Sequence, residues 1–591
     1  MLFSFSNSKW FGASNYLKLM IIFVGWSALW SLSVAQISPS QEREAASRNA
    51  QELLRRQQQE QQLRKESEGV PNVRLPHERL KTPELPVETP CFVIQRLEIK
   101  STTNEPLADF DWVLEQLSAS QGDGFMGQCI GAQGVAWVTE QAQKILIDRG
   151  LVTTRVLTHQ QDISKGTLVL TLIPGRIRAI RLSELVDPRA NLSNAFPMQA
   201  GDLLNLRDIE QALENLKRVP TAEVDIQIEP SQAVDAQMGD SDLLVAYRQP
   251  FPLRLSWIAD DSGTKATGRK QGSVRVSFDN PLTLNDLFYV INTNSLGDGY
   301  SGPRGNHATT IHYSVPFGYW TLDATASTGS YYQTVAGLNQ NYVYQGINEN
   351  KEIKLNRLWF RDEKQKVNLA IRAFQRKSNN YIDDTEVNVQ RRVVGGWDGS
   401  VNHKIFFQDA TKLESNLTYK RGTGAFGSIP APEEASNNGT SRFVLMVADT
   451  NFSMPFKLDD QRIRYDSSWR YQINGTALTP QDRFVIGGRY TVRGYDGESV
   501  LSAERGWFWR NEWRFSLGDS SQEFYAGLDT GQVGGPSSDL LVATKLTGAV
   551  MGLRGAIHNL QYDLFIGKPI NKPDNFNTAS STAGFSLSAS F

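Results

Sequence analysis

The residues best suited to specific chemistry lie in and just after the segment 484–512, FVIGGRYTVRGYDGESVLSAERGWFWRNE. Arg493 stands between two glycine-containing turns, in what reads as a long loop. An arginine withdrawn from water needs a carboxylate, because breaking such a pair leaves a costly unpaired charge. Asp529 is the candidate partner, since Gly527 on the same strand face leaves room for a close approach, and Glu512 is the alternative. The expected chemistry is an ion pair that locks a loop, although the residues alone equally allow a solvated Arg493.

Residues for catalysis or metal binding do not form a recognisable set. The six histidines are scattered: His77, His159, His307, His312, His403 and His558. His307 and His312 are five apart, which places them on opposite faces of a strand, where they cannot share a metal. No G-x-S-x-G or P-loop motif is present, and RGYDG lacks the strand-to-helix context of a phosphate cradle. We therefore expect no enzyme, no cofactor and no metal site.

Aromatic and charged residues alternate along the segment that follows Arg493. On one face of the next segment lie Trp507, Trp509, Trp513 and Phe515, and on the other Arg510, Glu512 and Arg514. Similar alternation continues from 251 to the end, where a strand finishes on the aromatic Phe591, the expected C-terminal signal of a barrel. Charges facing a dry sandwich core would be costly, whereas a membrane barrel puts apolar residues toward lipid and polar ones toward a wet lumen. At roughly 20 residues per strand and connection, 250–591 predicts about 16 antiparallel strands, with an inward-folding loop around 478–500.

The N-terminal region reads as targeting sequence, helix and linker. Residues 1–35 carry two lysines, an apolar run and small residues before Gln36, which indicates a cleaved signal peptide; a membrane anchor is the alternative. Within 36–68, the stretch 41–67 lacks Gly and Pro and is polar nearly all round, so it predicts a helix of about 40 Å. Such a helix fits a water-lined pore as a plug, or else forms a periplasmic arm. Five prolines make 69–90 a stiff linker.

Two α/β units occupy 91–174 and 175–249. The first predicts strands over 91–99, 151–158 and 166–173 with helices over 107–117 and 135–148, and the second repeats this βααββ order in shorter form. Cys91 and Cys129 are the only cysteines, which suggests one disulfide in an exported chain, with two free thiols as the alternative. The net charge of −2 argues against nucleic acid as a partner. A mean hydropathy of −0.38 excludes a helical membrane protein.

The motif Thr491-Val492-Arg493-Gly494-Tyr495 resembles the VRGY motif of the Omp85 superfamily. The chain from 36 to 591 resembles the two-partner secretion branch of that superfamily, the TpsB transporters of ShlB/FhaC type, which include the CdiB proteins. The supporting features are PCFVI at the start of the first unit, GDLLNLRDIEQALENLKR in the second, the segment 524–531 and GKPINKPDNF before the last strand.

This resemblance implies a 16-stranded outer-membrane β-barrel, two periplasmic POTRA domains and a pore-plugging α-helix. It also implies that the VRGY tip of the loop reaches Asp529 on the barrel wall. The implied function is nucleotide-independent export of one large unfolded exoprotein of TpsA type (a hemolysin, an adhesin or a contact-dependent growth-inhibition toxin) through the POTRA domains and pore. Outer-membrane lipid and the barrel assembly machinery are further expected partners. An outer-membrane assembly factor is the alternative function, followed by a passive porin.

Overall fold

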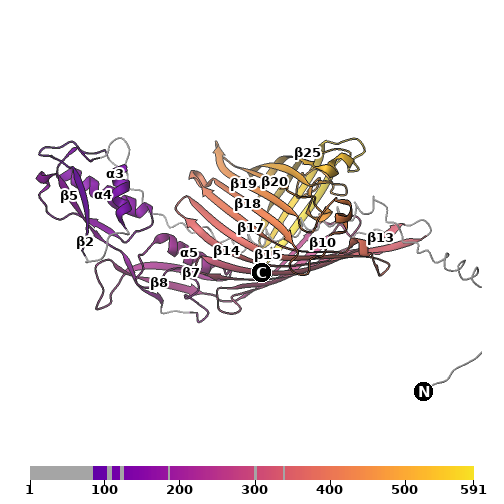
Figure 1. Ribbon diagram of the computed structural model, residues 1–591, viewed down its shortest axis with the longest axis horizontal. Helices are drawn as coiled ribbons and strands as arrows, with labels where there is room; N and C mark the ends of the chain where they lie inside the picture. The colour runs from indigo at the N-terminus through magenta and orange to yellow at the C-terminus, as the bar shows by residue number, and fades with distance from the viewer. Residues whose placement is uncertain (1–83, 103–109, 120–124, 184–186, 298–301, 337–339) are drawn as a thin grey trace, which may run out of the picture.

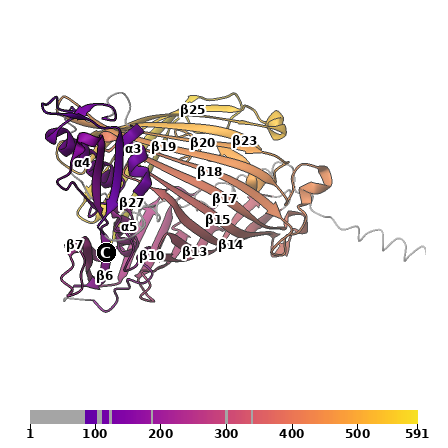
Figure 2. The same cartoon turned by 60° about the vertical axis from the view of Figure 1, so that its left-hand side comes forward.

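The computed structural model describes residues 84–591 except 103–109, 120–124, 184–186, 298–301 and 337–339. The predicted signal peptide, the predicted plug helix and most of the linker lie outside the described residues. Two small α/β units precede a large closed barrel, and the second unit lies against one end of it (Figure 1). The view in Figure 2 places the C-terminus at that same end.

The first α/β unit packs two helices on a small mixed sheet. Its elements are β1 (Phe92–Val93), β2 (Arg96–Ser101), α3 (Asp111–Ala119), β3 (Cys129–Ile130), α4 (Ala132–Asp148), β4 (Arg155–Leu157) and β5 (Thr167–Ile173). Helix α4 buries Val138, Ala142 and Leu146, spaced four apart, in one core with alternate residues of β5. The predicted strand over 91–99 is wrong as one element, because β1 pairs with β3 while β2 pairs with β5 in a separate sheet. Of the predicted strand over 151–158, only the residues of β4 form a strand.

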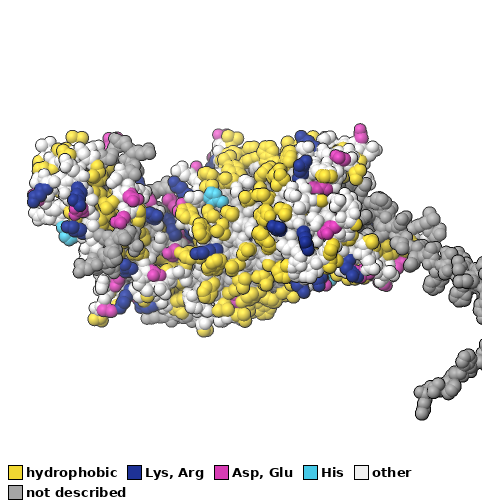
Figure 3. Space-filling view, viewed as in Figure 1, with side chains coloured by type: hydrophobic (Ala, Val, Ile, Leu, Met, Phe, Trp, Pro, Cys, Tyr) yellow, Lys and Arg dark blue, Asp and Glu magenta, His cyan; other side chains and the backbone are white. Residues whose placement is uncertain are grey.

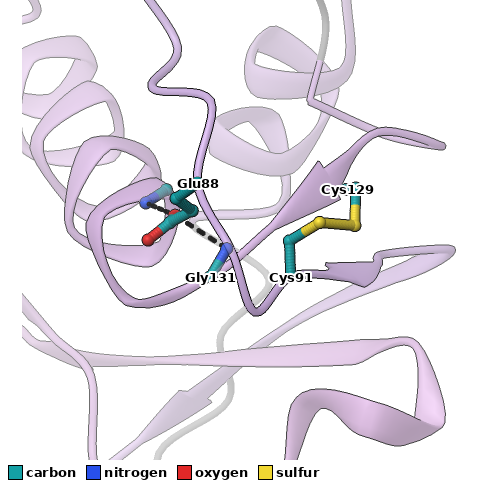
Figure 4. The surroundings of a disulfide bond; sticks show 5 residues. Glu88, Cys91, Cys129 and Gly131 are labelled. Atoms are coloured by element: carbon teal, nitrogen blue, oxygen red, sulfur yellow. Dashed lines mark hydrogen bonds between the residues drawn. A yellow bond between two sulfur atoms is a disulfide. The ribbon is translucent and has the colours of Figure 1, made fainter.

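The chain enters this unit through a carboxylate cap and a disulfide. Glu88 accepts backbone N–H bonds from Gly131 at 2.7 Å, Gln133 at 3.0 Å and Gly134 at 2.6 Å, at the start of α4 (Figure 4). Loss of hydration raises the pKa of the Glu88 carboxyl, but these donors outweigh it and hold the pKa below its ordinary value. Cys91 is disulfide-bonded to Cys129, with Cα atoms 5.2 Å apart. The last residues of the linker are therefore fixed to the first unit.

The second α/β unit has the sheet order β6–β8–β7 with one helix against it. Its elements are β6 (Arg176–Leu182), α5 (Leu206–Lys217), β7 (Glu223–Pro230) and β8 (Asp240–Arg248). Between β6 and α5 the described residues form turns rather than a helix, so the expected βααββ repeat is incomplete here. The side chain of Asn205 accepts the Arg207 N–H and starts α5.

Within the described residues, sixteen antiparallel strands close the barrel, and the two-residue β16 (Thr385–Glu386) extends one hairpin. The strands are β9 (Leu253–Asp260), β10 (Gln271–Asp279), β11 (Leu287–Ser295), β12 (Arg304–Phe317), β13 (Trp320–Ala336), β14 (Asn341–Arg361), β15 (Gln365–Ile382), β17 (Arg392–Phe406), β18 (Lys412–Thr423), β19 (Val444–Leu458), β20 (Gln461–Asn474), β23 (Arg505–Ser516), β24 (Glu523–Gly534), β25 (Lys545–Ile557), β26 (Leu560–Asn571) and β27 (Thr582–Ser590). The last strand, β27, pairs with the first, β9, which closes the barrel.

Side-chain alternation separates the outside of the barrel from its lumen. On β24, Leu528 is 54% exposed while the neighbouring Asp529 is fully buried, and on β23 the outward Trp509 and Trp513 flank the buried Glu512. Hydrophobic side chains cover the middle of the barrel surface (Figure 3). This pattern suits a barrel with its outside in lipid and its charges inside.

Polar side chains join the second unit to the barrel. Asn215 of α5 donates to the carbonyl oxygens of Ala195 and Gly318, both at 2.7 Å, and Gly318 lies in the turn between β12 and β13. Arg361, at the end of β14, pairs with Glu210 and Glu214 of α5 at 3.0 Å each. These contacts are buried, so the unit and the barrel are firmly connected.

Candidate functional site

The long connection between β20 and β23 folds onto the inner wall of the barrel. Within it, β21 (Phe484–Ile486) pairs with β22 (Leu501–Ala503), and this small hairpin packs in an apolar cluster with residues of β23, β24 and β25. The segment 487–500 between the two short strands carries the VRGY motif. We call 484–503 the inner loop.

Glycines on both sides let the inner loop lie close to the wall. Gly494 has φ +102, and a Cβ there would lie 2.6 Å from the carbonyl oxygen of Lys568 on β26. On the wall, a Cβ at Gly548 of β25 would lie 2.0 Å from the Arg493 carbonyl oxygen. A Cβ at Gly567 of β26 would lie 2.9 Å from the Cα of Gly494. Side chains at these positions would push the loop away.

Arg493 makes a fork of hydrogen bonds to Asp529. Its Nε donates to Oδ2 at 2.7 Å, its Nη2 donates to Oδ1 at 2.9 Å, and its backbone N–H donates to Oδ2 at 3.0 Å. Its Nη1 also contacts the Glu512 carboxylate. Asp529 is fully buried and Arg493 is nearly so. The structure thus brings together the predicted pair, and Asp529 and Glu512, which the sequence offered as alternatives, both bind the arginine.

Further arginines surround this pair. Glu512 is shared with Arg514 Nε at 2.9 Å and Arg554 Nη2 at 3.0 Å, while Arg510 Nε lies 3.8 Å from Asp529. Each carboxylate therefore faces more than one guanidinium. The inner wall forms an extended charge network around the tip of the loop.

The remaining motif residues pack the tip against the wall. Val492 is fully buried in the apolar cluster of the inner loop. The Tyr495 hydroxyl donates to the Thr547 carbonyl oxygen at 3.0 Å, and its ring packs edge-on against Phe576, with centroids 5.8 Å apart. A Cβ at Gly527 would lie 2.7 Å from Arg493 Nη2, which agrees with the space expected at this glycine.

Sequence reasoning missed several residues of the site. Gly548 and Gly567 gave no signal of their own, because isolated strand glycines are common. Arg489 of the inner loop also contacts the wall, at Asp261, and these two residues are 228 positions apart. At the chain end, the backbone N–H and C=O of Phe591 hydrogen-bond to the backbone of Leu255 on β9. The predicted C-terminal signal residue therefore lies where the last and first strands of the barrel meet.

In the part of the chain that the structure describes, no three His, Cys, Asp or Glu side chains form a group that could hold a metal ion. His307 contacts Asn294, and His312 contacts Thr325 and stacks on Tyr289. Among the same residues, no helix has the length and apolar character needed to span a bilayer.

A closed sixteen-stranded barrel with an apolar belt, two α/β units at one end and a loop ion-paired inside defines a class of outer-membrane transporter. The sequence matches a haemolysin secretion/activation protein family, ShlB/FhaC/HecB, over 239–555, a POTRA domain over 176–230 and a ShlB-type POTRA domain over 92–175. The chain belongs to the ShlB/FhaC/HecB family.

Known relatives match most of the chain. The outer membrane transporter CdiB-2 of Burkholderia pseudomallei (strain 1026b) is 36% identical over 94% of this chain and 96% of its own length. The hemolysin transporter ShlB of Serratia marcescens is 24% identical over 76% of this chain and 77% of its own. The solved structure of CdiB from Acinetobacter baumannii covers 93% of this chain and 99% of its own, at 28% identity and a TM-score of 0.81.

These findings establish where the protein lies and what it does. It is an outer-membrane translocator of two-partner secretion, with its POTRA domains in the periplasm. The second α/β unit therefore marks the periplasmic end of the barrel, and the inner loop enters from the outer end.

Proposed function

We propose that this chain exports one large exoprotein in unfolded form, and that Arg493, Asp529 and Glu512 lock the inner loop in the lumen. The observation that carries the proposal is the three-bond fork from Arg493 to a fully buried Asp529. A buried arginine on a loop that has no strand partners on the wall is stable in only two surroundings, paired with carboxylates or in water. The lock therefore has two states, and the lumen is wider in the second.

The other segments of the chain are assigned from the sequence and from the family to which the chain belongs. We take 1–35 as a signal peptide, 36–68 as the plug segment, 69–90 as the linker, 91–174 and 175–249 as the two POTRA domains and 250–591 as the barrel. The exoprotein is captured in extended form at a sheet edge, and β7 is one such edge in the order β6–β8–β7. A helix of about 10–12 Å diameter leaves the pore, and a chain of similar width takes its place. Folding outside then prevents return. We assign no catalytic step to the chain.

The exported protein should be encoded beside this one as a very long chain, and its surface delivery tests the proposal. Deletion of this protein should abolish delivery, wild type should restore it, and Arg493→Ala should insert in the membrane but fail to restore it. Normal delivery by Arg493→Ala would remove the lock from the mechanism. If delivery persisted on deletion while other barrel proteins fell in abundance, the chain would be an assembly factor.

The plug assignment has its own test. Deletion of 41–67 should raise the ion conductance of the purified protein in planar bilayers, because a polar helix no longer fills the lumen. Unchanged conductance would show that this segment lies outside the pore at rest.

A further inference from the structure

The strand pairing that closes the barrel is the shortest between neighbouring strands of the sixteen. β27 pairs with β26 over eight residue pairs, from Thr582 to Ala589, but with β9 over only five, from Ser586 to Ser590. The outer part of β27, residues 582–585, thus has no backbone partner on the β9 side. We call this region, between 582–585 and 261–269, the outer seam.

β9 ends because its chain turns away from the wall. The Asp260 carboxylate accepts the Ser262 N–H at 2.8 Å, a local side-chain turn that competes with strand continuation. The next residue, Asp261, lies outside β9, and its side chain contacts β27. Backbone groups on β27 that lose a strand partner need another hydrogen-bond partner.

Two side chains supply those partners. The Asp261 carboxylate accepts the Phe585 N–H at 2.9 Å, and Arg489 of the inner loop donates from Nη2 to the Phe585 carbonyl oxygen at 3.1 Å. Arg489 Nη1 also donates to Asp261 at 3.0 Å. An ion pair thus stands in for one missing residue pair of the strand ladder.

Neighbouring contacts strengthen this arrangement. The Arg489 guanidinium lies over the Phe565 ring of β26, 4.8 Å from its centroid. Arg269 donates to the Ala583 carbonyl oxygen at 3.0 Å and lies 3.2 Å from Asp261. A Cβ at Gly584 would lie 2.9 Å from the Asp261 carboxylate, so the glycine admits it.

We propose that Arg489 and Asp261 close the outer seam, and that this closure depends on the inner loop lying in the lumen. Arg489 is a positioning residue, because it holds the Asp261 side chain against β27. It belongs to the inner loop, which Arg493, four residues further along the chain, anchors to β23 and β24. Release of the loop therefore frees the outer seam, which lets the outer end of the barrel widen while the exoprotein passes. The coupling rests on the loop lock proposed above, whereas closure of the seam by Arg489 does not.

Hydrogen exchange of the purified full-length protein in lipid nanodiscs, without exoprotein, tests the closure. Arg489→Gln should accelerate exchange of the Phe585 amide roughly tenfold, as expected for the loss of a charge-supported hydrogen bond. Asp261→Ala should accelerate it more, and Arg489→Lys, which keeps the positive charge but not the fork of two donor nitrogens, should fall between wild type and Arg489→Gln. Arg470→Gln is the matched control, since Arg470 pairs with Asp449 elsewhere on the wall at similar exposure.

A distance measurement adds a readout of opening. Spin labels at Lys265→Cys and Ser580→Cys, both exposed on opposite sides of the outer seam, would report its width. Both native cysteines are disulfide-bonded and take no label. Arg489→Gln should shift the distance distribution to longer values, and Arg470→Gln should not.

The outcomes separate the two proposals. Unchanged Phe585 exchange and label distance in Arg489→Gln, or an equal rise of exchange throughout β15, would overturn the seam proposal. Arg493→Ala does not touch the seam, so faster Phe585 exchange in that variant supports the coupling, and unchanged exchange overturns it. If the outer seam opens in Arg489→Gln while Arg493→Ala secretes normally, the loop lock is refuted and the proposal that Arg489 closes the seam is supported.

Discussion

Asp529→Asn should release the inner loop without changing the shape of the wall. The carboxylate is fully buried and accepts three bonds from Arg493. The asparagine amide has nearly the volume of the carboxylate, but it carries no charge and places its own N–H donor against the N–H donors of Arg493. Breaking one side of a buried ion pair costs about 3–5 kcal/mol, and the remaining contact to Glu512 favours the lower end. At about 1.4 kcal/mol per factor of ten, the released fraction should rise roughly 100-fold.

Cysteine labelling measures that fraction. Thr491 is buried beside the motif, so Thr491→Cys should react with a polar maleimide only when the loop leaves the wall. Combined with Asp529→Asn, the reaction rate should rise by about two orders of magnitude over Thr491→Cys alone. Asp449→Asn makes the same chemical change at a wall carboxylate outside this network and should leave the rate unchanged. A rise below about threefold for Asp529→Asn would refute the reasoning, because the buried pair would then not hold the loop.

Three further changes test neighbouring parts of the structure. Gly527→Ala adds a methyl 2.7 Å from the loop arginine and should raise the same labelling rate with no change of charge, whereas Gly552→Ala, which crowds a wall carbonyl at 2.5 Å, should not. Replacing both Cys91 and Cys129 by Ala opens a loop of 38 residues and should lower the unfolding free energy of the first POTRA domain by about 4 kcal/mol in denaturant titrations. The folded-state pKa of Glu88 is lowered, so its contribution to stability is complete above the ordinary pKa of 4.5 and is lost as pH falls through the folded value; the stability difference between wild type and Glu88→Gln should therefore shrink below pH 4.5, and a constant difference would contradict the cap.

Strand alternation made the barrel and the main ion pair predictable. Inward and outward positions on a strand follow from parity alone, so Leu528 outside fixes Asp529 inside. An arginine in a loop that enters a lumen then needs an inward carboxylate nearby, and few candidates lie on adjacent strands. The sequence left Asp529 and Glu512 as alternatives because parity does not give distance, and in the folded chain one guanidinium reaches both.

Contacts set by barrel closure were beyond such reasoning. Arg489 and Asp261 meet because the first and last strands are neighbours, and because Asp260 turns β9 away at one particular residue. The described residues between β6 and α5 form turns instead of a helix for a similar reason: this unit covers its sheet with α5 and the turns around Phe196, and it packs against the barrel. The secondary-structure propensity of single residues predicts neither the Arg489–Asp261 contact nor the turns before α5.

The contrast between the inner loop and the second POTRA domain indicates which part moves during export. Asn215 bridges two backbone carbonyls, and Arg361 pairs with Glu210 and Glu214, all at the periplasmic turns of the barrel. Pulling this domain from the barrel would leave several buried charges and amides unpaired at once, at a cost of several kcal/mol for each charge. Releasing the inner loop breaks the Arg493 and Arg489 ion pairs and uncovers the apolar tip, but the carboxylates of both sites keep other arginines as partners. We therefore expect opening at the loop and the outer seam to be the less costly route, with the POTRA–barrel joint fixed while it occurs.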